Sequence, residues 1–344
     1  SGYTLPVTTT LKPLQIGAIR IELPVVLAAL AGYSDHPYRL LCREGGAMFC
    51  ATEMMLDKSV LMGGKLQRQM LLKSPADRPL AGQLIGNEPG TMARATAMLC
   101  GLGFDVVDLN FACPVHKALR RRRGGHFMRE PEDAVAIIRA VVAIADRPVT
   151  VKLRRSYEQA DTANDAFWRL AEGAFDAGVA ALCVHARSVE ARYAGRADWD
   201  FLARVKEHFA DRTIIGSGDV LTPAMALKML AQTGVDGAAV ARGALGNPWF
   251  FRQTADLAAG REPYAPDLAA QRAVILKHFE HSCEVYGPYR GPKVMRKFGI
   301  KYARLHPHPK LVRAGFIDIR RPEQCRPLID ELYPEQAPAA AGKE

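Results

Sequence analysis

Two stretches of the sequence decide the fold: Pro148-Val-Thr-Val-Lys-Leu-Arg154 and Ala181-Leu-Cys-Val-His-Ala-Arg187. Each is a short apolar run with the β-branched residues that favour strands, and residues 164–177 between them have the longer periodicity of a helix. A strand, a helix and a second strand in that order are typical of a parallel α/β protein. The pattern therefore predicts a β/α/β unit here.

The same unit recurs along the chain, and residues 89–102 and 132–145 supply two more of the intervening helical patterns. The predicted strands are 24–29, 47–54, 80–86, 106–111, 148–154, 181–187, 213–219 and 237–242. Eight β-then-α units in about 225 residues match a (β/α)8 TIM barrel. A doubly wound open sheet would rarely need eight strands.

The composition changes after the eighth unit. Gly260-Arg-Glu-Pro263 and Pro266 indicate a linker. Helical patterns follow at 268–285, 292–305 and 322–332. The predicted domains are an N-terminal extension (1–13), a TIM barrel (14–259), a small C-terminal helical domain (260–334) and a disordered tail (335–344).

The overall composition excludes several classes of protein. With 344 residues, 49% hydrophobic and 24% charged, the chain is neither disordered nor fibrous. No apolar run approaches the roughly 18 residues of a membrane-spanning helix, and residues 1–10 lack the layout of a signal peptide. We therefore expect a cytoplasmic protein without membrane contact. The seven cysteines form no C-x-x-C pair, so we expect free thiols and no metal site.

Basic residues are concentrated in two places, and the net charge is +10. Between Arg290 and Arg326, eleven Lys or Arg stand against the two acidic residues Asp318 and Glu323. Residues 120–123 are four consecutive arginines. Because these clusters carry a single sign of charge, they favour a polyanionic partner over a merely solvated face.

Polar side chains gather at one end of the predicted barrel. In residues 149–154, Val149, Val151 and Leu153 share one face, because successive strand residues point to opposite sides. The residues predicted on the inner side of the strands are Glu53, Gln83, Asp108, Asn110, Thr150, Lys152, Arg154, Cys183, His185 and Arg187. They lie toward the C-terminal strand ends, where TIM barrels hold their active sites. Because buried polar groups are costly without partners, we expect a polar ligand there.

The seventh and eighth strands end in glycine-containing turns, Gly216-Ser-Gly-Asp219 and Ala241-Arg-Gly-Ala244. TIM barrels commonly bind phosphate at this place. Glycine lets backbone N–H groups approach an anion, and Arg242 supplies a planar fork of donors. Cys113 directly follows the fourth strand and is expected in the same mouth.

These motifs, taken in order, resemble the tRNA-dihydrouridine synthases, which are flavin-dependent enzymes that reduce uridine in tRNA, and most closely their bacterial B-type branch. The resemblance covers residues 14–253 in register and the helical domain more loosely. It rests on Ala31-Gly-Tyr-Ser-Asp35, Arg39-Leu-Leu-Cys-Arg43, Gln83-Leu-Ile-Gly86, Asp108-Leu-Asn-Phe-Ala-Cys-Pro114, Val151-Lys-Leu-Arg154, Val184-His-Ala-Arg187, Tyr193-Ala-Gly-Arg-Ala-Asp-Trp199, Gly216-Ser-Gly-Asp219 and Arg242-Gly-Ala-Leu-Gly-Asn-Pro-Trp249.

The resemblance implies FMN as cofactor, NADPH as reductant, tRNA as partner and Cys113 as proton donor. The cofactor contacts that it implies are Ala29, Leu30, Ala31, Gln83, Lys152, His185, Ser217, Gly218, Asp219, Ala241 and Arg242. It places Asn110 and Arg187 at the substrate base or cofactor. The basic clusters add Arg120, Arg296 and Lys297 as RNA contacts. We expect the protein to be a monomer.

The chemistry of such an enzyme explains these residue types. Reduced flavin carries negative charge near N1 and the C2 oxygen, which a cation such as Lys152 stabilises. Hydride delivered to C6 of uracil requires a proton at C5 from the opposite side, which Cys113 can donate. An ordinary thiol, with a pKa near 8.5, is mostly protonated at neutral pH.

The sequence departs from the family pattern at several positions. The family usually has Ala-Pro-Met where this chain has Ala28-Ala-Leu30, Asn at Ser217, and Gly at Ala112 and Ala241. In the loop after Cys113, arginines 120–123 stand where glycines are usual, so we expect altered RNA contact or loop motion.

Two other functions remain open from the residues. One is an FMN barrel oxidoreductase that acts on a small pyrimidine, which the basic helical domain disfavours because a free base needs no polyanion platform. The other is an RNA-binding relative without flavin chemistry, which the presence of Gln83, Cys113, Lys152 and His185 disfavours. The uridine position is not determined by the sequence.

Overall fold

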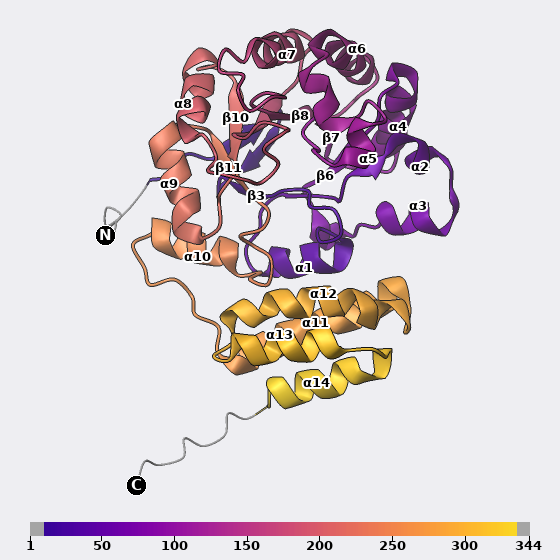
Figure 1. The fold of residues 1–344 in the computed structure, drawn as a ribbon, viewed down its shortest axis with the longest axis vertical. Coiled ribbons are helices and arrows are strands. Elements are labelled where there is room, and N and C mark those ends of the chain that lie inside the picture. Colours follow the sequence, from indigo (N-terminus) through magenta and orange to yellow (C-terminus); the bar gives the residue numbers. More distant parts are fainter. Residues whose placement is uncertain (1–9, 336–344) are drawn as a thin grey trace.

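In the computed structural model, which describes residues 10–335, parallel strands close into a barrel surrounded by helices (Figure 1). The strands of the barrel are β3 (Val25–Leu27), β4 (Cys50–Ala51), β6 (Leu80–Ile85), β7 (Val106–Asn110), β8 (Val149–Arg154), β9 (Ala181–His185), β10 (Thr213–Ser217) and β11 (Gly237–Val240). Strand β11 pairs with β3, and β4 pairs with both β3 and β6. The predicted (β/α)8 barrel is confirmed. Residues 1–9 and 336–344, which hold most of the predicted extension and tail, lie outside the described residues.

The second strand is shorter than the predicted range 47–54. Strand β4 ends at Ala51, and β5 (Met55–Leu56) pairs with the later part of β6. Between them, the Gln83 N–H donates a hydrogen bond of 3.1 Å to Thr52 Oγ1, a side-chain acceptor. The side chain of Thr52 thus takes a place in the ladder that a backbone carbonyl would hold, and the strand is interrupted.

Helices follow most strands and cover the outside of the barrel. They are α1 (His36–Glu44), α2 (Asp57–Leu61), α3 (Gly64–Met70), α4 (Pro89–Gly101), α5 (His116–Leu119), α6 (Pro131–Val142), α7 (Asp165–Asp176), α8 (Trp199–His208), α9 (Pro223–Thr233) and α10 (Phe250–Ala258), with 3-10 turns η1 (Pro75–Asp77) and η2 (Gly124–Met128). Several begin at side-chain caps, which satisfy free N–H groups of the first turn. Glu88 accepts from Gly90 and Thr91 at α4, and Asp198 accepts from Phe201 at α8.

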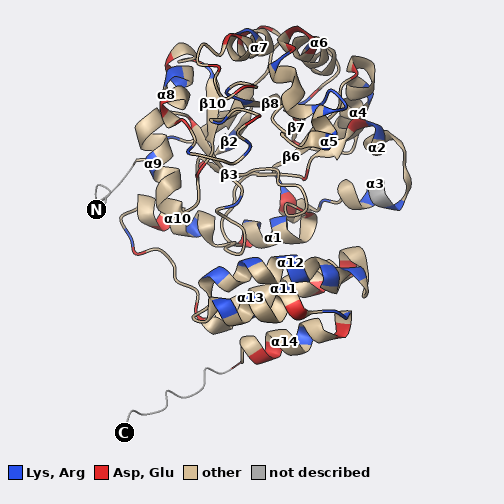
Figure 2. Ribbon diagram, viewed as in Figure 1, with Lys and Arg blue, Asp and Glu red and all other residues tan. Residues whose placement is uncertain are grey.

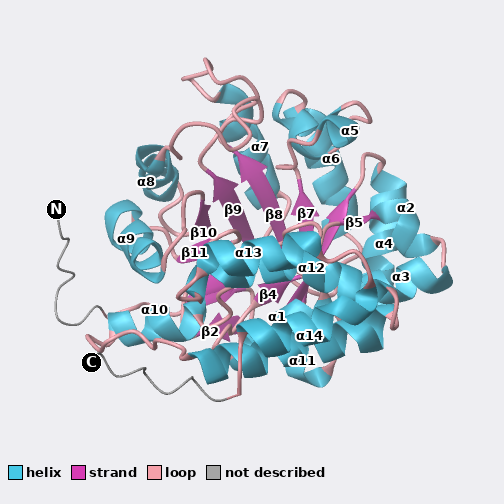
Figure 3. Cartoon of the chain, turned by 60° about the horizontal axis from the view of Figure 1, so that its bottom comes forward, coloured by secondary structure: helices cyan, strands magenta, loops and turns pink. Residues whose placement is uncertain are grey.

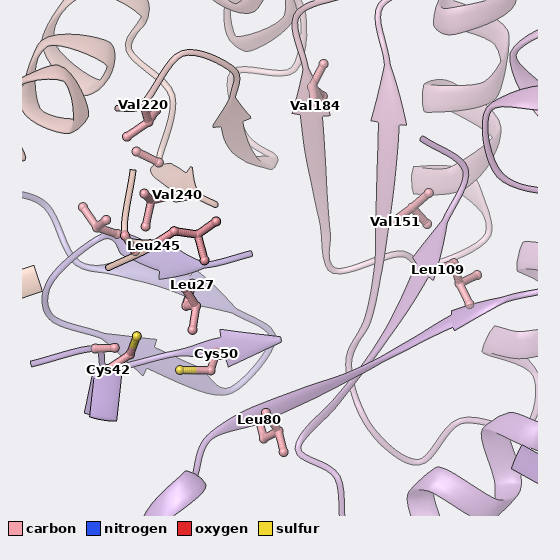
Figure 4. Packing of buried hydrophobic residues seen from close by; sticks show 14 of the residues in the cluster. Leu27, Cys42, Cys50, Leu80, Leu109, Val151, Val184, Val220, Val240 and Leu245 are labelled. Atoms are coloured by element: carbon pink, nitrogen blue, oxygen red, sulfur yellow. The ribbon is translucent and has the colours of Figure 1, made fainter. Parts of the chain in front are cut away.

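Apolar residues form one layer outside the strands and another inside. Figure 4 shows members of the outer cluster on several barrel strands, among them Leu80, Leu109, Val151, Val184 and Val240. Fully burying such a side chain stabilises the fold by about 1.5–3 kcal/mol. The strand faces therefore follow the predicted alternation.

A hairpin absent from the sequence-based prediction packs against the inner cluster. Strands β1 (Leu14–Ile16) and β2 (Ile19–Ile21) pair antiparallel around a turn in which Gly17 has φ of +57°. Leu14, Ile16 and Ile21 pack with interior residues such as Val106 and Ile215. Their burial fills the N-terminal end of the barrel, so the polar residues gather at the other end.

Four helices after the linker form a bundle, here called the helical domain (Figure 3). They are α11 (Leu268–Tyr286), α12 (Arg290–Tyr302), α13 (Pro309–Asp318) and α14 (Cys325–Leu332), with 3-10 turns η3 (Ala303–Leu305) and η4 (Pro322–Gln324). Helix α13, which begins at Pro309 in the sequence His306-Pro-His-Pro309, is absent from the predicted helices. Proline fits the first turn of a helix, where its missing N–H has no partner to lose, so these prolines introduce a helix.

Within residues 10–335, no helix is long and apolar enough to span a membrane. All seven cysteines are free thiols. No group of three or more His, Cys, Asp or Glu side chains in the same residues is arranged to hold a metal ion.

Candidate active site

A cavity lies at the C-terminal end of the barrel strands. The predicted site residues that line it are Ala29, Leu30, Ala31, Gln83, Asn110, Cys113, Lys152, His185, Ser217, Gly218, Asp219, Ala241 and Arg242. The structure therefore brings together the implied proton donor, all the implied cofactor contacts and one implied substrate contact. Arg120, Arg187, Arg296 and Lys297 do not line it.

A chain of hydrogen bonds across three strands, β6, β7 and β8, holds the first group of polar side chains at the cavity. Asp108 accepts at Oδ1 from the Thr150 hydroxyl (2.7 Å) and at Oδ2 from Gln83 Nε2 (2.6 Å). Gln83 Oε1 in turn accepts from Asn110 Nδ2 at 2.8 Å. Burial raises the pKa of Asp108, and the two donors oppose that rise. These bonds fix the orientation of both amides that face the cavity.

Asn110 extends this chain to the loop that carries the thiol. Its Oδ1 accepts from the N–H groups of Ala112 (3.1 Å) and Cys113 (2.9 Å). The position of Cys113 thus depends on Asn110 and, through Gln83, on the buried carboxyl of Asp108.

A second group of polar side chains surrounds Lys152. Its Nζ lies 3.4 Å from Cys183 Sγ and 3.4 Å from Ser217 Oγ. Within residues 10–335, no carboxylate lies within ion-pair distance of this ammonium. A cation so placed favours negative charge on whatever occupies the cavity.

His185 stands beside this cation with one ring nitrogen unpaired. Its Nδ1 lies 3.3 Å from Ser217 Oγ, whereas its buried Nε2 has no hydrogen-bond partner among the described residues. Burial, together with the charges of Arg154 and Lys152, holds the pKa of His185 well below its usual value. The ring is therefore neutral at pH 7, with one nitrogen left for a ligand.

The turn after β10 is shaped by a glycine and a paired carboxylate. Gly218 has φ of +118°, and a Cβ there would come within 2.8 Å of Ala197 Cβ. Asp219 accepts from Arg187 Nη2 at 2.6 and 2.7 Å and from the Ala197 N–H at 2.8 Å. Burial opposes ionisation of Asp219, but these donors keep its pKa below the usual value. Arg187 thus holds the turn from behind.

Cys113 lies under a loop built from glycines and arginines. The side chain is 8% exposed, and burial raises the pKa of its thiol. The Gly125 N–H donates to the Cys113 carbonyl at 2.9 Å, and a Cβ on Gly124 would lie 2.8 Å from Cys113 Cβ. Glycine is therefore needed where the loop passes the thiol.

The four arginines of this loop divide into two pairs. Arg122 has φ of +51° and donates to Glu130 (2.6 Å) and Asp133 (3.1 Å), and Arg123 Nε donates to Asn87 at 3.4 Å. Arg120 and Arg121 are exposed and have no side-chain partner among the described residues. This second pair therefore keeps both guanidinium groups for an external anion.

Two polar residues that were not among the predicted site residues, Arg154 and Tyr193, also line the cavity. Arg154 is 3% exposed and donates to the carbonyls of Ala112, Ser188 and Arg192, each at 2.8 Å. Burial lowers its pKa to about 10. Tyr193 lies 5.8 Å from the guanidinium of Arg154, measured to the ring centroid. Strand parity already placed Arg154 on the inner side, so a signal for it was available.

This arrangement fits the flavin that the resemblance implies. A flavin needs donors and acceptors at a flat polar ring and an anion site for its phosphate. The neutral His185 with its unpaired Nε2, the cation of Lys152, and the Gly218 turn beside Arg242 provide both.

Lys and Arg recur along the helices of the helical domain (Figure 2), but some of them bind carbonyl groups of this chain. On α12, Lys297 donates to the carbonyl of Gly32, and Arg296 donates to the carbonyl of Ile317 at 2.6 Å. By contrast, Lys310 and Arg313 on α13 are exposed and have no side-chain partner within residues 10–335.

Comparison with known proteins gives a consistent result. The dihydrouridine synthase family model matches residues 26–337. tRNA-dihydrouridine synthase B of Xanthomonas campestris pv. campestris is 32% identical over 321 residues, 93% of this chain and 96% of the relative. A probable tRNA-dihydrouridine synthase of Rickettsia prowazekii is 33% identical, with 93% and 97% covered.

Solved structures with a similar fold include a complex of 2-naphthoyl-CoA reductase and a histamine dehydrogenase from Rhizobium sp. 4-9, each with a TM-score of 0.57 and 12% identity. They cover 74% and 79% of this chain, which spans about half the length of each. At this identity the similarity concerns the fold alone.

Proposed function

This chain belongs to the dihydrouridine synthase family, and we propose that it reduces uridine to 5,6-dihydrouridine in cytoplasmic tRNA with bound FMN and with NADPH as reductant. The observation that carries the proposal is the shared cavity of Gln83, Cys113, Lys152 and His185, with the Gly218 turn at its edge. We also propose the domain division at residues 259 and 260, in the segment between α10 and α11.

When bound, the flavin supplies the hydride that is added to C6 of uracil. Lys152 contributes the positive charge that favours an electron-rich ring, since no carboxylate among the described residues lies within ion-pair distance of it. His185 Nε2 and the amide of Gln83 offer hydrogen bonds to ring heteroatoms. The Gly218 turn and Arg242 hold the phosphate.

Cys113 holds the proton that C5 requires. Burial keeps the thiol protonated to higher pH than an exposed thiol, as a donor requires. Asn110 fixes the backbone N–H of Cys113 and presents its amide at the same wall, so it positions the donor and contacts the base.

The nucleobase reaches this cavity only after it leaves its stack in folded tRNA, which costs a few kcal/mol. Contacts to the RNA backbone offset that cost. Arg120 and Arg121 in the loop that follows Cys113, and Lys310 and Arg313 on α13, are exposed cations suited to phosphate. Arg296 and Lys297 stay among the proposed RNA contacts, although each also holds a carbonyl of this chain.

The test is to purify the full chain, record its visible spectrum, and incubate it with NADPH and an unmodified tRNA transcript. We expect a flavin spectrum and dihydrouridine that mass spectrometry detects in the RNA. A colourless protein that refuses added FMN would overturn the enzymatic proposal. Reduction of free uracil or another small pyrimidine, with no product in tRNA, would instead favour a small-molecule oxidoreductase.

A further inference from the structure

Arg304 reaches from the helical domain to two loops at the barrel mouth. It lies on η3, directly after α12. Its Nη1 donates to the carbonyls of Gly243 (2.7 Å) and Leu245 (3.3 Å), and its Nη2 donates to the carbonyl of Leu221 at 3.4 Å. One guanidinium therefore joins the loop after β10 to the loop after β11.

These two loops carry the residues that we propose for the cofactor phosphate. Asp219 and Leu221 belong to the first loop, and Ala241 and Arg242 belong to the second. The side chains of the two loops also approach each other, since Arg242 Nη2 lies 3.7 Å from Asp219 Oδ1. The distance between the loops thus sets the geometry of the anion site.

The loops touch each other through backbone atoms. A Cβ on Gly243 would overlap the carbonyl oxygen of Val220 and would lie 3.0 Å from Leu221 Cα. Such close approach brings carbonyl dipoles together behind the cavity, which is unfavourable unless a donor satisfies them. A guanidinium suits this task because its fork offers several donors in fixed directions.

We propose that Arg304 is a positioning residue for the cofactor phosphate: from the helical domain it clamps the two phosphate-facing loops at the spacing that the anion requires. This inference rests on the proposed function. It makes the helical domain part of the cofactor site as well as a platform for RNA.

Two further contacts show that α12 is seated on the mouth. Lys297 donates to the carbonyl of Gly32, which lies next to Ala31 in the loop after β3. Gly246, with φ of +73°, passes so close to α12 that a Cβ would overlap the carbonyl of Lys301. The helix therefore has a fixed place from which Arg304 can hold the loops.

The test compares FMN with riboflavin, which has the same ring and ribityl chain but no phosphate. Full-length Arg304→Gln, stripped of flavin, is titrated with each ligand by flavin fluorescence. We expect the Kd for FMN to rise about tenfold, the loss of one good charge-assisted interaction, and the Kd for riboflavin to stay within about twofold of wild type. Gly243→Ala, which pushes the same loops apart, should show the same selectivity.

Arg320→Gln is the matched control, because Arg320 is exposed and donates to the carbonyl of Ile317 within the helical domain. It should change neither Kd. If Arg304→Gln leaves both affinities unchanged, or weakens FMN and riboflavin by the same factor, the clamp is refuted while the proposed function stands. If wild-type protein binds neither flavin, the proposed function itself fails.

Thermal melting identifies a variant that does not fold. If Arg304→Gln does not fold, Arg304→Lys replaces it, and we expect a smaller loss of affinity for FMN than in Arg304→Gln and no loss for riboflavin. Equal losses for both ligands in Arg304→Lys would refute the clamp.

Discussion

The barrel mouth and the helical domain both concentrate polar and charged side chains, but only in the mouth do the side chains converge as the sequence predicts. At the mouth, Gln83, Lys152 and His185 face one cavity. In the helical domain, Lys297 and Arg304 donate to carbonyls of the barrel, whereas Arg313 on the next helix has no side-chain partner among residues 10–335.

The difference follows from the geometry of the two kinds of element. In a strand, alternate residues point to opposite faces, so one buried apolar face fixes the direction of the polar residues between. In a helix, a count of charges says nothing about direction, since a long Lys or Arg can reach solvent or a neighbouring carbonyl from many positions. Charge predicts a type of partner, and packing decides which cations remain for it.

The largest expected effect tests the mouth alone. Replacing the proposed proton donor by Cys113→Ala should lower dihydrouridine formation by about 10²–10⁴-fold, the range for loss of a general acid. FMN affinity should not change, because the implied flavin contacts remain. Product is measured in tRNA under single turnover, and flavin by its absorbance. Cys100→Ala, on α4 outside the cavity, is the control, and full activity of Cys113→Ala would remove the thiol from the mechanism.

A smaller effect is expected from the carboxyl beneath the mouth. Asp108→Asn replaces an acceptor with a donor opposite Gln83 or Thr150, which leaves a buried bond unmade and costs about 1–3 kcal/mol of stability. We expect a rate about tenfold lower, since Gln83 and Asn110 would reorient around Cys113. Chemical denaturation and single-turnover kinetics measure the two quantities. Thr150→Val, which removes only the outer donor, should do less. Equal rates in Asp108→Asn and wild type would show that this chain of bonds does not position the thiol.

The mouth was largely predictable because its residues sit on strands or directly after them. The parity of Val149, Val151 and Leu153 placed Lys152 inward, and family motifs added the turns at Gly218 and Arg242. Tyr193 was missed as a site residue because it lies on a long loop whose path depends on contacts such as that with Arg154. The hairpin of β1 and β2 was missed because its strands have only three residues each.

The presence of helices in the helical domain was predictable from the sequence, but the contacts of their cations were not. Its helices follow from apolar periodicity, apart from α13. That helix begins at Pro309, directly after Pro307 and His308. That Arg304 binds three barrel carbonyls depends on how α12 packs on the mouth, and no local pattern encodes that packing. The same holds for the separation of Arg120 and Arg121 from Arg122 and Arg123.

Charge reversal of exposed cations on α13 tests whether the helical domain binds RNA. The double change Lys310→Glu and Arg313→Glu should weaken tRNA binding several-fold and flatten its salt dependence, because each cation that meets a phosphate releases counterions. FMN affinity and thermal stability should not change. Filter binding over a range of salt concentrations measures the effect.

Reversing Arg296 and Lys297 is the matched experiment on partnered cations. It should also weaken tRNA binding, but with a loss of stability, since Lys297→Glu would face the carbonyl of Gly32. If both pairs lower RNA affinity alike and neither alters stability, the distinction between free and partnered cations in this domain is wrong. If neither pair affects RNA affinity, the domain is not the RNA platform.

The smallest expected effect is the response of the chemical step to pH. Burial raises the pKa of Cys113, opposed in part by the Val115 N–H and the charge of Arg154. A proton donor works below its pKa and is lost as pH rises through it, so a raised pKa moves the loss to higher pH. We therefore expect the single-turnover rate to stay constant from neutral pH to at least about 8.5, where an ordinary thiol is half ionised. His185 adds no change in this range, because its lowered pKa leaves it neutral throughout. Alkylation of Cys113 by iodoacetamide should rise along the same curve as the rate falls, since only the thiolate reacts. A rate that already declines between pH 7 and 8 would mean that another group at the mouth supplies the proton.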